Sequence, residues 1–281
     1  MRKLVSRSLP ICFAALFAGP AAAAPLLYLV AADDALLRTV DAADASTVSS
    51  VAITLAGRSV QGANGLARQP GSGTLYALLK LAGQSDRELV TLDPATGVAT
   101  SVGDTGRKMA GLAFDAAGTL YGVVGDQQFS QNPEDPETLF TLSLADATPT
   151  FFRALGNGDD GETIAFRPDD GLLYHASGTH LSQVFETLDL QSGVVSDIPL
   201  SGDAYVEAGA LTWNGAGFFM ADIADDAESG GSLYRLSAGG VATEIGTLDV
   251  LQPKGLVLVP EPGTAALLAL GLLALGRRRA R

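Results

Sequence analysis

The sequence predicts an all-β protein, a β-propeller of about five four-stranded blades. Three observations predict this fold: a fixed repeat, a strand pattern within each repeat, and a first repeat split between the two ends. The repeat is marked by an aromatic residue that recurs at intervals of 48, 45, 53 and 45 residues. A unit of roughly 40–50 residues with four short strands is typical of a propeller blade. The markers are Tyr28, Tyr76, Tyr121, Tyr174 and Phe219.

Each repeat has the same order of short apolar segments. Gly-Leu-Ala-Phe is followed by a turn, Gly-x-Leu-Tyr, a variable loop, Leu-x-Thr-Leu, a second turn and a last strand; the clearest copy spans 111–155. The strands are rich in β-branched and aromatic residues, and turn pairs such as Asp93-Pro94 and Asn214-Gly215 separate them. A two-sheet sandwich is the main alternative fold, but sandwiches do not normally show five similar copies.

The first repeat is incomplete at the N-terminal end. Segments 26–29, 36–41 and 47–53 supply three strands, and the missing Gly-Leu strand is found at 255–258. A ring closed by a strand from each terminus leaves no open sheet edge at the axis. The sequence therefore predicts a propeller over residues 24–258.

The N-terminal segment has the features of a secretory signal peptide. A basic start, Arg2-Lys3, precedes an apolar stretch at 9–18 and the small residues 21–24. We expect signal peptidase to cut after Ala23, so residues 1–23 are the signal peptide; a buried N-terminal helix is the alternative. The single cysteine, Cys12, lies within this segment, so the mature protein is expected to contain neither disulfides nor thiol chemistry.

A second apolar segment follows the propeller. Val259, Pro260, Glu261 and Pro262 precede an Ala- and Leu-rich run at 265–276. As a helix, residues 264–276 would cover roughly 20 Å at about 1.5 Å per residue, less than the about 30 Å of a bilayer core. A basic cluster closes the segment and would stay on the cytoplasmic side. Its residues are Arg277, Arg278 and Arg279.

This order of motif, short apolar helix and arginine cluster resembles the PEP-CTERM sorting signal of Gram-negative bacteria. The resemblance covers residues 259–281 and concerns the sorting signal alone. It implies processing by an exosortase, attachment to the membrane through the helix before processing, and a final place in the envelope, at the cell surface or in the extracellular matrix. It also implies exopolysaccharide or surface proteins as partners. An ordinary C-terminal membrane anchor is the alternative.

The charge distribution excludes nucleic acid as a partner. The chain has a formal net charge of -13, and seven of its 18 basic residues lie in the first ten and last five positions. The 11 other basic residues stand against all 31 acidic ones, so the segment between carries a charge of -20. Such a surface repels a polyanion.

The loops between the second and third strands are expected to form the binding face. They carry nearly all the length variation among the repeats, and insertions gathered on one face often mark where ligands bind. These loops are acidic, and carboxylate oxygens suit Ca²⁺. Acidic loops that only keep an exported protein soluble are the alternative. The candidate metal ligands are Asp225 and Asp226 in one of these loops, and Asp159, Asp160 and Glu162 in a loop on the same face that enters an innermost strand.

Two functional hypotheses follow. The first is a non-enzymatic binding or structural platform, because the sequence has no Gly-x-Ser-x-Gly elbow and no phosphate-binding loop. The second is a Ca²⁺-dependent propeller hydrolase or lactonase, which needs oxygen ligands converging at the axis. The residues expected before the innermost strands are Asn64, Ala110, Glu162, Gly209 and Lys254. Of these five, only Asn64 and Glu162 are good ligands for Ca²⁺. No cofactor other than Ca²⁺ is expected.

Overall fold

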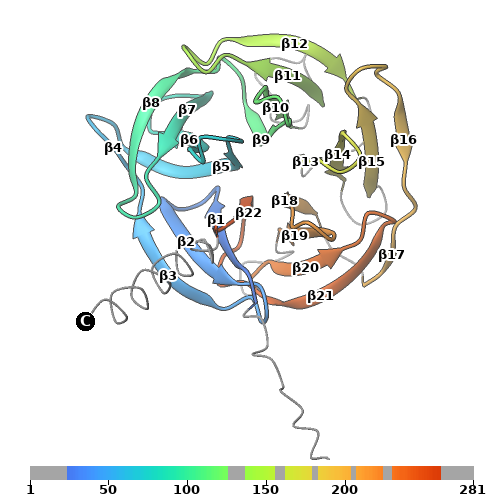
Figure 1. Ribbon diagram of the computed structural model, residues 1–281. Coiled ribbons are helices and arrows are strands. Elements are labelled where there is room, and N and C mark those ends of the chain that lie inside the picture. The colour runs from blue at the N-terminus through green and yellow to red at the C-terminus, as the bar shows by residue number, and fades with distance from the viewer. Residues whose placement is uncertain are drawn as a thin grey trace, which may run out of the picture.

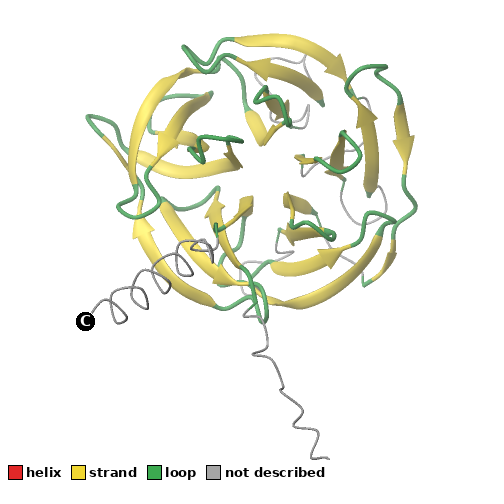
Figure 2. Cartoon of the chain, viewed as in Figure 1, coloured by secondary structure: helices red, strands yellow, loops and turns green. Residues whose placement is uncertain are grey.

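The computed structural model is a ring of five β-sheets around a central axis, which confirms the predicted five-bladed propeller (Figures 1 and 2). The structure describes residues 24–125, 137–155, 162–178, 183–203, 207–223 and 230–260. All the regular structure in these ranges is β-strand, as expected from repeats that combine β-branched and aromatic residues with glycine turns.

From the axis outward, each blade consists of four antiparallel strands. Blade one contains, in that order, β22 (Pro253–Leu258), β1 (Leu26–Ala31), β2 (Leu36–Asp41) and β3 (Thr47–Ala52). Blade two contains β5 (Val60–Arg68), β6 (Leu75–Leu81), β7 (Arg87–Leu92) and β8 (Val98–Asp104). Blade three contains β9 (Met109–Phe114), β10 (Leu120–Val124), β11 (Thr138–Leu142) and β12 (Pro149–Ala154). Blade four contains β13 (Thr163–Arg167), β14 (Leu172–Ser177), β15 (Val184–Asp189) and β16 (Val195–Asp197). Blade five contains β18 (Ala208–Trp213), β19 (Phe218–Asp222), β20 (Ser232–Leu236) and β21 (Val241–Thr247).

A strand from each end of the propeller closes the ring. β22 pairs antiparallel with β1, and Leu258 lies opposite Leu27 while Gly255 lies opposite Val30. The sequence predicted this closure, and blade one in Figure 1 shows its consequence: the red β22 lies beside the blue β1. The first and last strands of the propeller are therefore held in one sheet.

Two very short strands were not predicted. β4 (Thr54–Leu55) pairs parallel with β8, and β17 (Ser201–Gly202) pairs parallel with β21. Each belongs to the segment that leaves one blade and enters the next. They attach the outer edge of one blade to the preceding blade and cover an edge strand that would otherwise be open.

The hydrophobic core is divided among the interfaces between neighbouring blades. Five clusters of buried side chains occupy the five interfaces. Because successive side chains of a strand point to opposite faces of a sheet, each blade contributes to two clusters. In β6, for example, Leu79 packs toward blade one and Leu78 toward blade three.

Glycines allow the innermost strands to approach one another. A Cβ atom on Gly255 would lie 2.8 Å from the carbonyl carbon of Gly65 and the nitrogen of Leu66. A Cβ atom on Gly209 would lie 2.2 Å from the oxygen of Pro253. A glycine is thus required at the start of the Gly-Leu motif where β22 meets β5, and at the residue before the corresponding position, Ala210, where β18 meets β22.

Substituting one of these glycines should loosen the ring. We expect Gly255→Ala to lower the free energy of unfolding by about 1–3 kcal/mol, because the added methyl group meets backbone atoms that cannot move aside. Gly239→Ala is the matched control, since its Cβ atom would have no neighbour closer than 3.8 Å. Urea unfolding monitored by circular dichroism measures both. Equal stability of the two variants would contradict the close approach.

Candidate functional site

The channel along the axis has two chemically different ends. We call the end formed by the loops between second and third strands the loop face, and the end formed by the turns between first and second strands the turn face. The innermost strands β22, β5, β9, β13 and β18 start at the loop face and end at the turn face.

A fully buried group of charged side chains lies near the loop face, between blades three and four. The His175 ring in β14 contacts two carboxylates, with Nδ1 3.0 Å from Glu186 Oε1 and Nε2 in a shorter contact with Glu162 Oε2. Ser177 Oγ donates a 2.6 Å hydrogen bond to Glu162 Oε1. The two glutamates and the histidine are each at most 1% exposed.

The strand pattern explains why these side chains meet. His175 pairs with Glu186 across β14 and β15, so their side chains share one face of blade four. The next pair on the same face toward the turn face, Leu173 and Leu188, packs in the cluster between blades three and four. Glu162 immediately precedes the innermost strand β13 and completes the group from there.

The carboxylates keep His175 charged. Burial alone would lower the pKa of the imidazole, but the charges and hydrogen bonds of Glu162 and Glu186 outweigh burial and raise the pKa to about 10. At neutral pH both ring nitrogens therefore carry a proton and donate, one to each carboxylate. The group is a closed internal network of charge-assisted hydrogen bonds.

The predicted metal ligands are only partly described by the structure. Asp159, Asp160, Asp225 and Asp226 lie outside the described residues. Glu162 is described, and both its oxygens are bonded, one to His175 and one to Ser177. Within the described ranges no three His, Cys, Asp or Glu side chains are grouped so that they could hold a metal ion. The Ca²⁺ site stays a prediction.

The other axial positions named from the sequence do not gather oxygen ligands. Asn64 Oδ1 accepts a 3.1 Å hydrogen bond from Arg87 Nε, and Lys254 Nζ lies 3.2 Å from Glu207 Oε1. Ala110 and Gly209 occupy the places where β9 and β18 shift register against their neighbours. Asn64 and Lys254 each have a side-chain partner within the protein.

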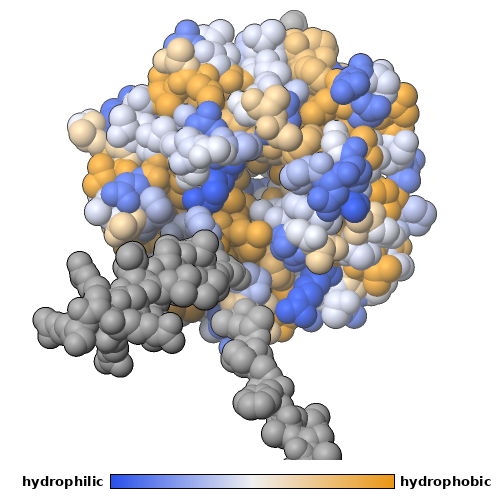
Figure 3. Space-filling model, in the orientation of Figure 1, coloured by the Kyte–Doolittle hydropathy of each residue, from blue (hydrophilic) through white to orange (hydrophobic). Residues whose placement is uncertain are grey.

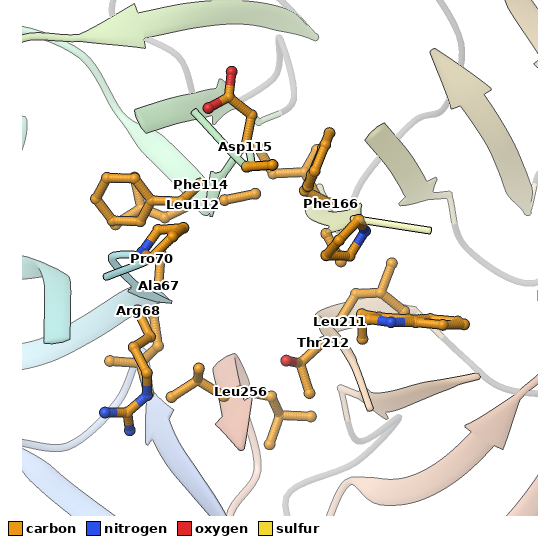
Figure 4. Close-up of a pocket in the computed structure, with 18 residues that line it drawn as sticks. Ala67, Arg68, Pro70, Leu112, Phe114, Asp115, Phe166, Leu211, Thr212 and Leu256 are labelled. Carbon is orange, nitrogen blue, oxygen red and sulfur yellow. The ribbon is translucent and has the colours of Figure 1, made fainter. Parts of the chain in front are cut away.

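A cavity of about 220 Å³ opens at the turn face of the channel (Figure 4). All five innermost strands line it, each with one leucine or isoleucine at depth, so its wall is built from alkyl groups. These side chains are Leu66, Leu112, Ile164, Leu211 and Leu256. The next position along each strand brings small side chains, which keep the channel open. They are Ala67, Ala113, Ala165, Thr212 and Val257.

The rim of this cavity is aromatic and carries few charges. Phe166 and Trp213 line it together with Arg68 and Asp115. The guanidinium carbon of Arg167 lies 4.7 Å from the centre of the Trp213 ring, in a cation–π contact. Seen along the axis, the uncovered part of one face is a mixture of hydrophilic and hydrophobic side chains rather than a single apolar patch (Figure 3).

The strand repeat carries a signal for the His175 network, although residue types alone did not predict it. In every repeat the marker aromatic lies opposite the Thr of Leu-x-Thr-Leu, or the residue in its place, as in the pair of Tyr174 and Thr187. The residue after the marker therefore lies opposite the residue before that Thr, which pairs His175 with Glu186. The third member, Glu162, follows only from the closing geometry of β13.

Comparison with known proteins finds matches for the sorting motif and for the fold. Residues 258–280 match the PEP-CTERM protein-sorting motif, which implies processing by an exosortase and export to the cell surface. The described residues include no helix with the length and hydrophobicity needed to cross a membrane. No protein of curated function matches the chain in sequence.

Several solved structures share the fold at very low sequence identity. A protein of unknown function from Bacteroides caccae is 11% identical with a TM-score of 0.55, over 85% of this chain and 100% of that one. A chain of the nidogen/laminin complex is 11% identical with a TM-score of 0.54, over 83% and 98%. TolB from Acinetobacter baumannii is 11% identical with a TM-score of 0.52, over 81% of this chain and 54% of TolB. At such identities the likeness shows the fold alone.

Proposed function

Because the chain joins a five-bladed propeller to a PEP-CTERM sorting motif, we propose that it is an exported, envelope-associated or matrix protein whose propeller serves as a rigid binding or structural platform. Its loop face would meet the partner, since the variable loops lie there. Exopolysaccharide or other surface proteins are the partners expected of such a platform.

The observation that carries this proposal is the place where the sorting motif begins. The match starts at Leu258, which is also the last residue of β22 and lies opposite Leu27 in blade one. No linker or further domain separates the ring-closing strand from the signal. What the sorting machinery would deliver and display is therefore the propeller itself.

The rest of the chain is divided in keeping with this proposal. Residues 1–23 would be removed by signal peptidase, residues 24–258 would remain as the propeller, and residues 259–281 would act as the sorting signal. The apolar run at 265–276 would hold the precursor in the membrane, with the arginines at 277–279 on the cytoplasmic side. A Gram-negative envelope is the expected setting.

The side chains near the axis support a platform rather than catalysis. The three polar residues named at the axis, Asn64, Glu162 and Lys254, each bond to another side chain, and the cavity at the turn face is walled by alkyl groups. A Ca²⁺-dependent hydrolase or lactonase would need carboxylates converging at the axis. Most of its predicted ligands lie outside the described residues, and no contact among the described ones favours it.

Changing the motif should block processing. In cells that contain an exosortase, we expect mass spectrometry of the wild-type protein to find residues 277–281 removed, and the protein to reach the cell-surface or matrix fraction. Glu261→Ala combined with Pro262→Ala should reduce this processing at least tenfold and leave the precursor in the membrane fraction.

Pro70→Ala, at an exposed proline in the turn between β5 and β6, is the control and should be processed normally. An intact arginine tail on wild-type protein from the cell surface would overturn the proposal.

A further inference from the structure

Two cations face each other at the loop face of blade two. Lys80 at the end of β6 lies directly opposite Arg87 at the start of β7. Like charges directly opposite each other in a sheet are destabilising. The neighbouring cation also acts on Lys80, because burial first and then Arg87 lower the pKa of its ammonium group.

The two cations are bonded only to neutral groups. Lys80 Nζ donates to the backbone oxygen of Ala32 at 2.8 Å, and Arg87 donates to Asn64 Oδ1 at 3.1 Å and to the backbone oxygen of Ser85 at 3.2 Å. Among the described residues neither cation forms an ion pair. Burial lowers the pKa of the Arg87 guanidinium as well, so both charges are partly removed from water, and within the described ranges no carboxylate is bonded to either.

The carboxylates around the pair are placed elsewhere. Asp33 and Asp86 act on the two cations only through space. Glu88 follows Arg87 in β7 and therefore points to the other face of the blade, where it accepts hydrogen bonds from Ser101 and Gln84. Asp104 accepts a hydrogen bond from the backbone nitrogen of Gly106.

The pair also belongs to a concentration of positive charge that is unusual in this acidic chain. Five of the 11 basic residues between the two charged ends lie at the loop-face end of blade two or in the segment that leads from it to blade three. They are Arg58, Lys80, Arg87, Arg107 and Lys108.

From this arrangement we propose that Lys80, Arg87 and Asn64 form a binding site for an oxyanion, such as the carboxylate of an acidic sugar or a phosphate ester. Lys80 would supply a point charge, Arg87 the planar pair of donors that fits two anion oxygens, and the Asn64 amide would hold Arg87 in place. Leu78 and Leu89, two residues inward from Lys80 and Arg87 along the same strands, are buried between blades two and three. The inference rests on the proposed function, because it gives the ligand class of the loop face.

The test uses three sugars that differ in charge. The melting temperature of the purified full chain in a zwitterionic detergent is measured against increasing glucuronate, glucose 6-phosphate and neutral glucose, at constant ionic strength. Anion binding to the folded state should raise Tm by mass action, whereas glucose should leave it unchanged. The more effective of the two anions identifies the acidic group.

Variants separate a binding site from a structural pair. Lys80→Met and Arg87→Met should each raise the apparent Kd for the anion at least tenfold, and Arg58→Met, which removes an exposed cation bonded to Gln84, should change it less than twofold. Without ligand, Lys80→Met should be at least as stable as wild type, because it relieves the repulsion.

Several results would overturn the inference: no Tm shift with either anion at 50-fold the concentration of protein and above, equal binding by all variants, or a large loss of stability in ligand-free Lys80→Met. Export and processing of the same variants should match wild type. Normal export without anion binding would therefore remove this site but leave the platform proposal standing.

Discussion

Truncation after Lys254 should unfold the propeller at temperatures where truncation after Pro260 leaves it intact. The first truncation removes Gly255–Leu258 and with it most of β22, so β1 loses its neighbour on the side of the axis and the ring is opened at blade one. Leu256 and Val257, which are buried in the interfaces on either side of blade one, would be lost. At about 1.5–3 kcal/mol for each buried side chain, the packing loss alone is roughly 3–6 kcal/mol. A typical domain is stable by about 5–15 kcal/mol.

Calorimetry of the two truncated proteins measures this difference. The longer form is the control, because it lacks the sorting segment but keeps every strand of blade one. A second control is the variant Leu256→Ala in the full chain, which should be destabilised by about 2–5 kcal/mol through a cavity in the same interface. Equal melting temperatures for the two truncations would show that β22 does not hold the ring together.

The ring closure was predictable because each repeat carries short sequence motifs that identify its strands. The aromatic marker, the Gly-Leu motif and the Leu-x-Thr-Leu motif each place a residue type where the blade needs it. Tyr121 in β10, for instance, lies opposite Ala113 of β9 on one side and Thr141 of β11 on the other. Every repeat has a large aromatic residue at this position of its second strand. A repeat fold can be predicted from sequence because local sequence and global fold agree in this way.

The elements that escaped prediction are those without a local pattern. Thr54–Leu55 and Ser201–Gly202 are two-residue strands whose pairing is parallel and depends on where the neighbouring blade lies. The axial cavity depends on the size of side chains from all five blades, which no single repeat reveals. The pairing of Lys80 with Arg87 was hidden because both lie at the ends of a loop, where register is least certain.

Glu162 shows why residue type alone does not assign the chemistry of the loop face. The sequence predicted Glu162 as a ligand of a metal ion, and in the structure its oxygens bond His175 and Ser177. A carboxylate in a sequence does not show whether its neighbour will be a metal or a protonated side chain. The identity of the neighbour depends on how the strands place residues that are 13 and 15 positions away along the chain.

The His175 network should make the protein lose stability as the pH rises. The imidazole has a pKa of about 10 in the folded protein against 6.5 in the unfolded chain. Below pH 6.5 both states are protonated and the stabilisation is fully present; between 6.5 and about 10 only the folded state keeps the proton, so the stabilisation declines with each unit of pH. The total loss is on the order of a few kcal/mol, since one unit of pKa corresponds to about 1.4 kcal/mol.

Comparison with His175→Gln isolates this contribution. Removing the charge leaves Glu162 and Glu186 buried without their cation, which should cost about 3–5 kcal/mol at pH 6.5. The difference in the free energy of unfolding between wild type and variant should then decrease steadily toward pH 10, because the wild-type histidine loses its proton and its stabilising charge there. Urea unfolding at pH 6, 7, 8, 9 and 10 measures the free energy of both proteins. A difference that stays constant across this range would show that His175 is not held in its charged form, and that the network between blades three and four is maintained by packing instead.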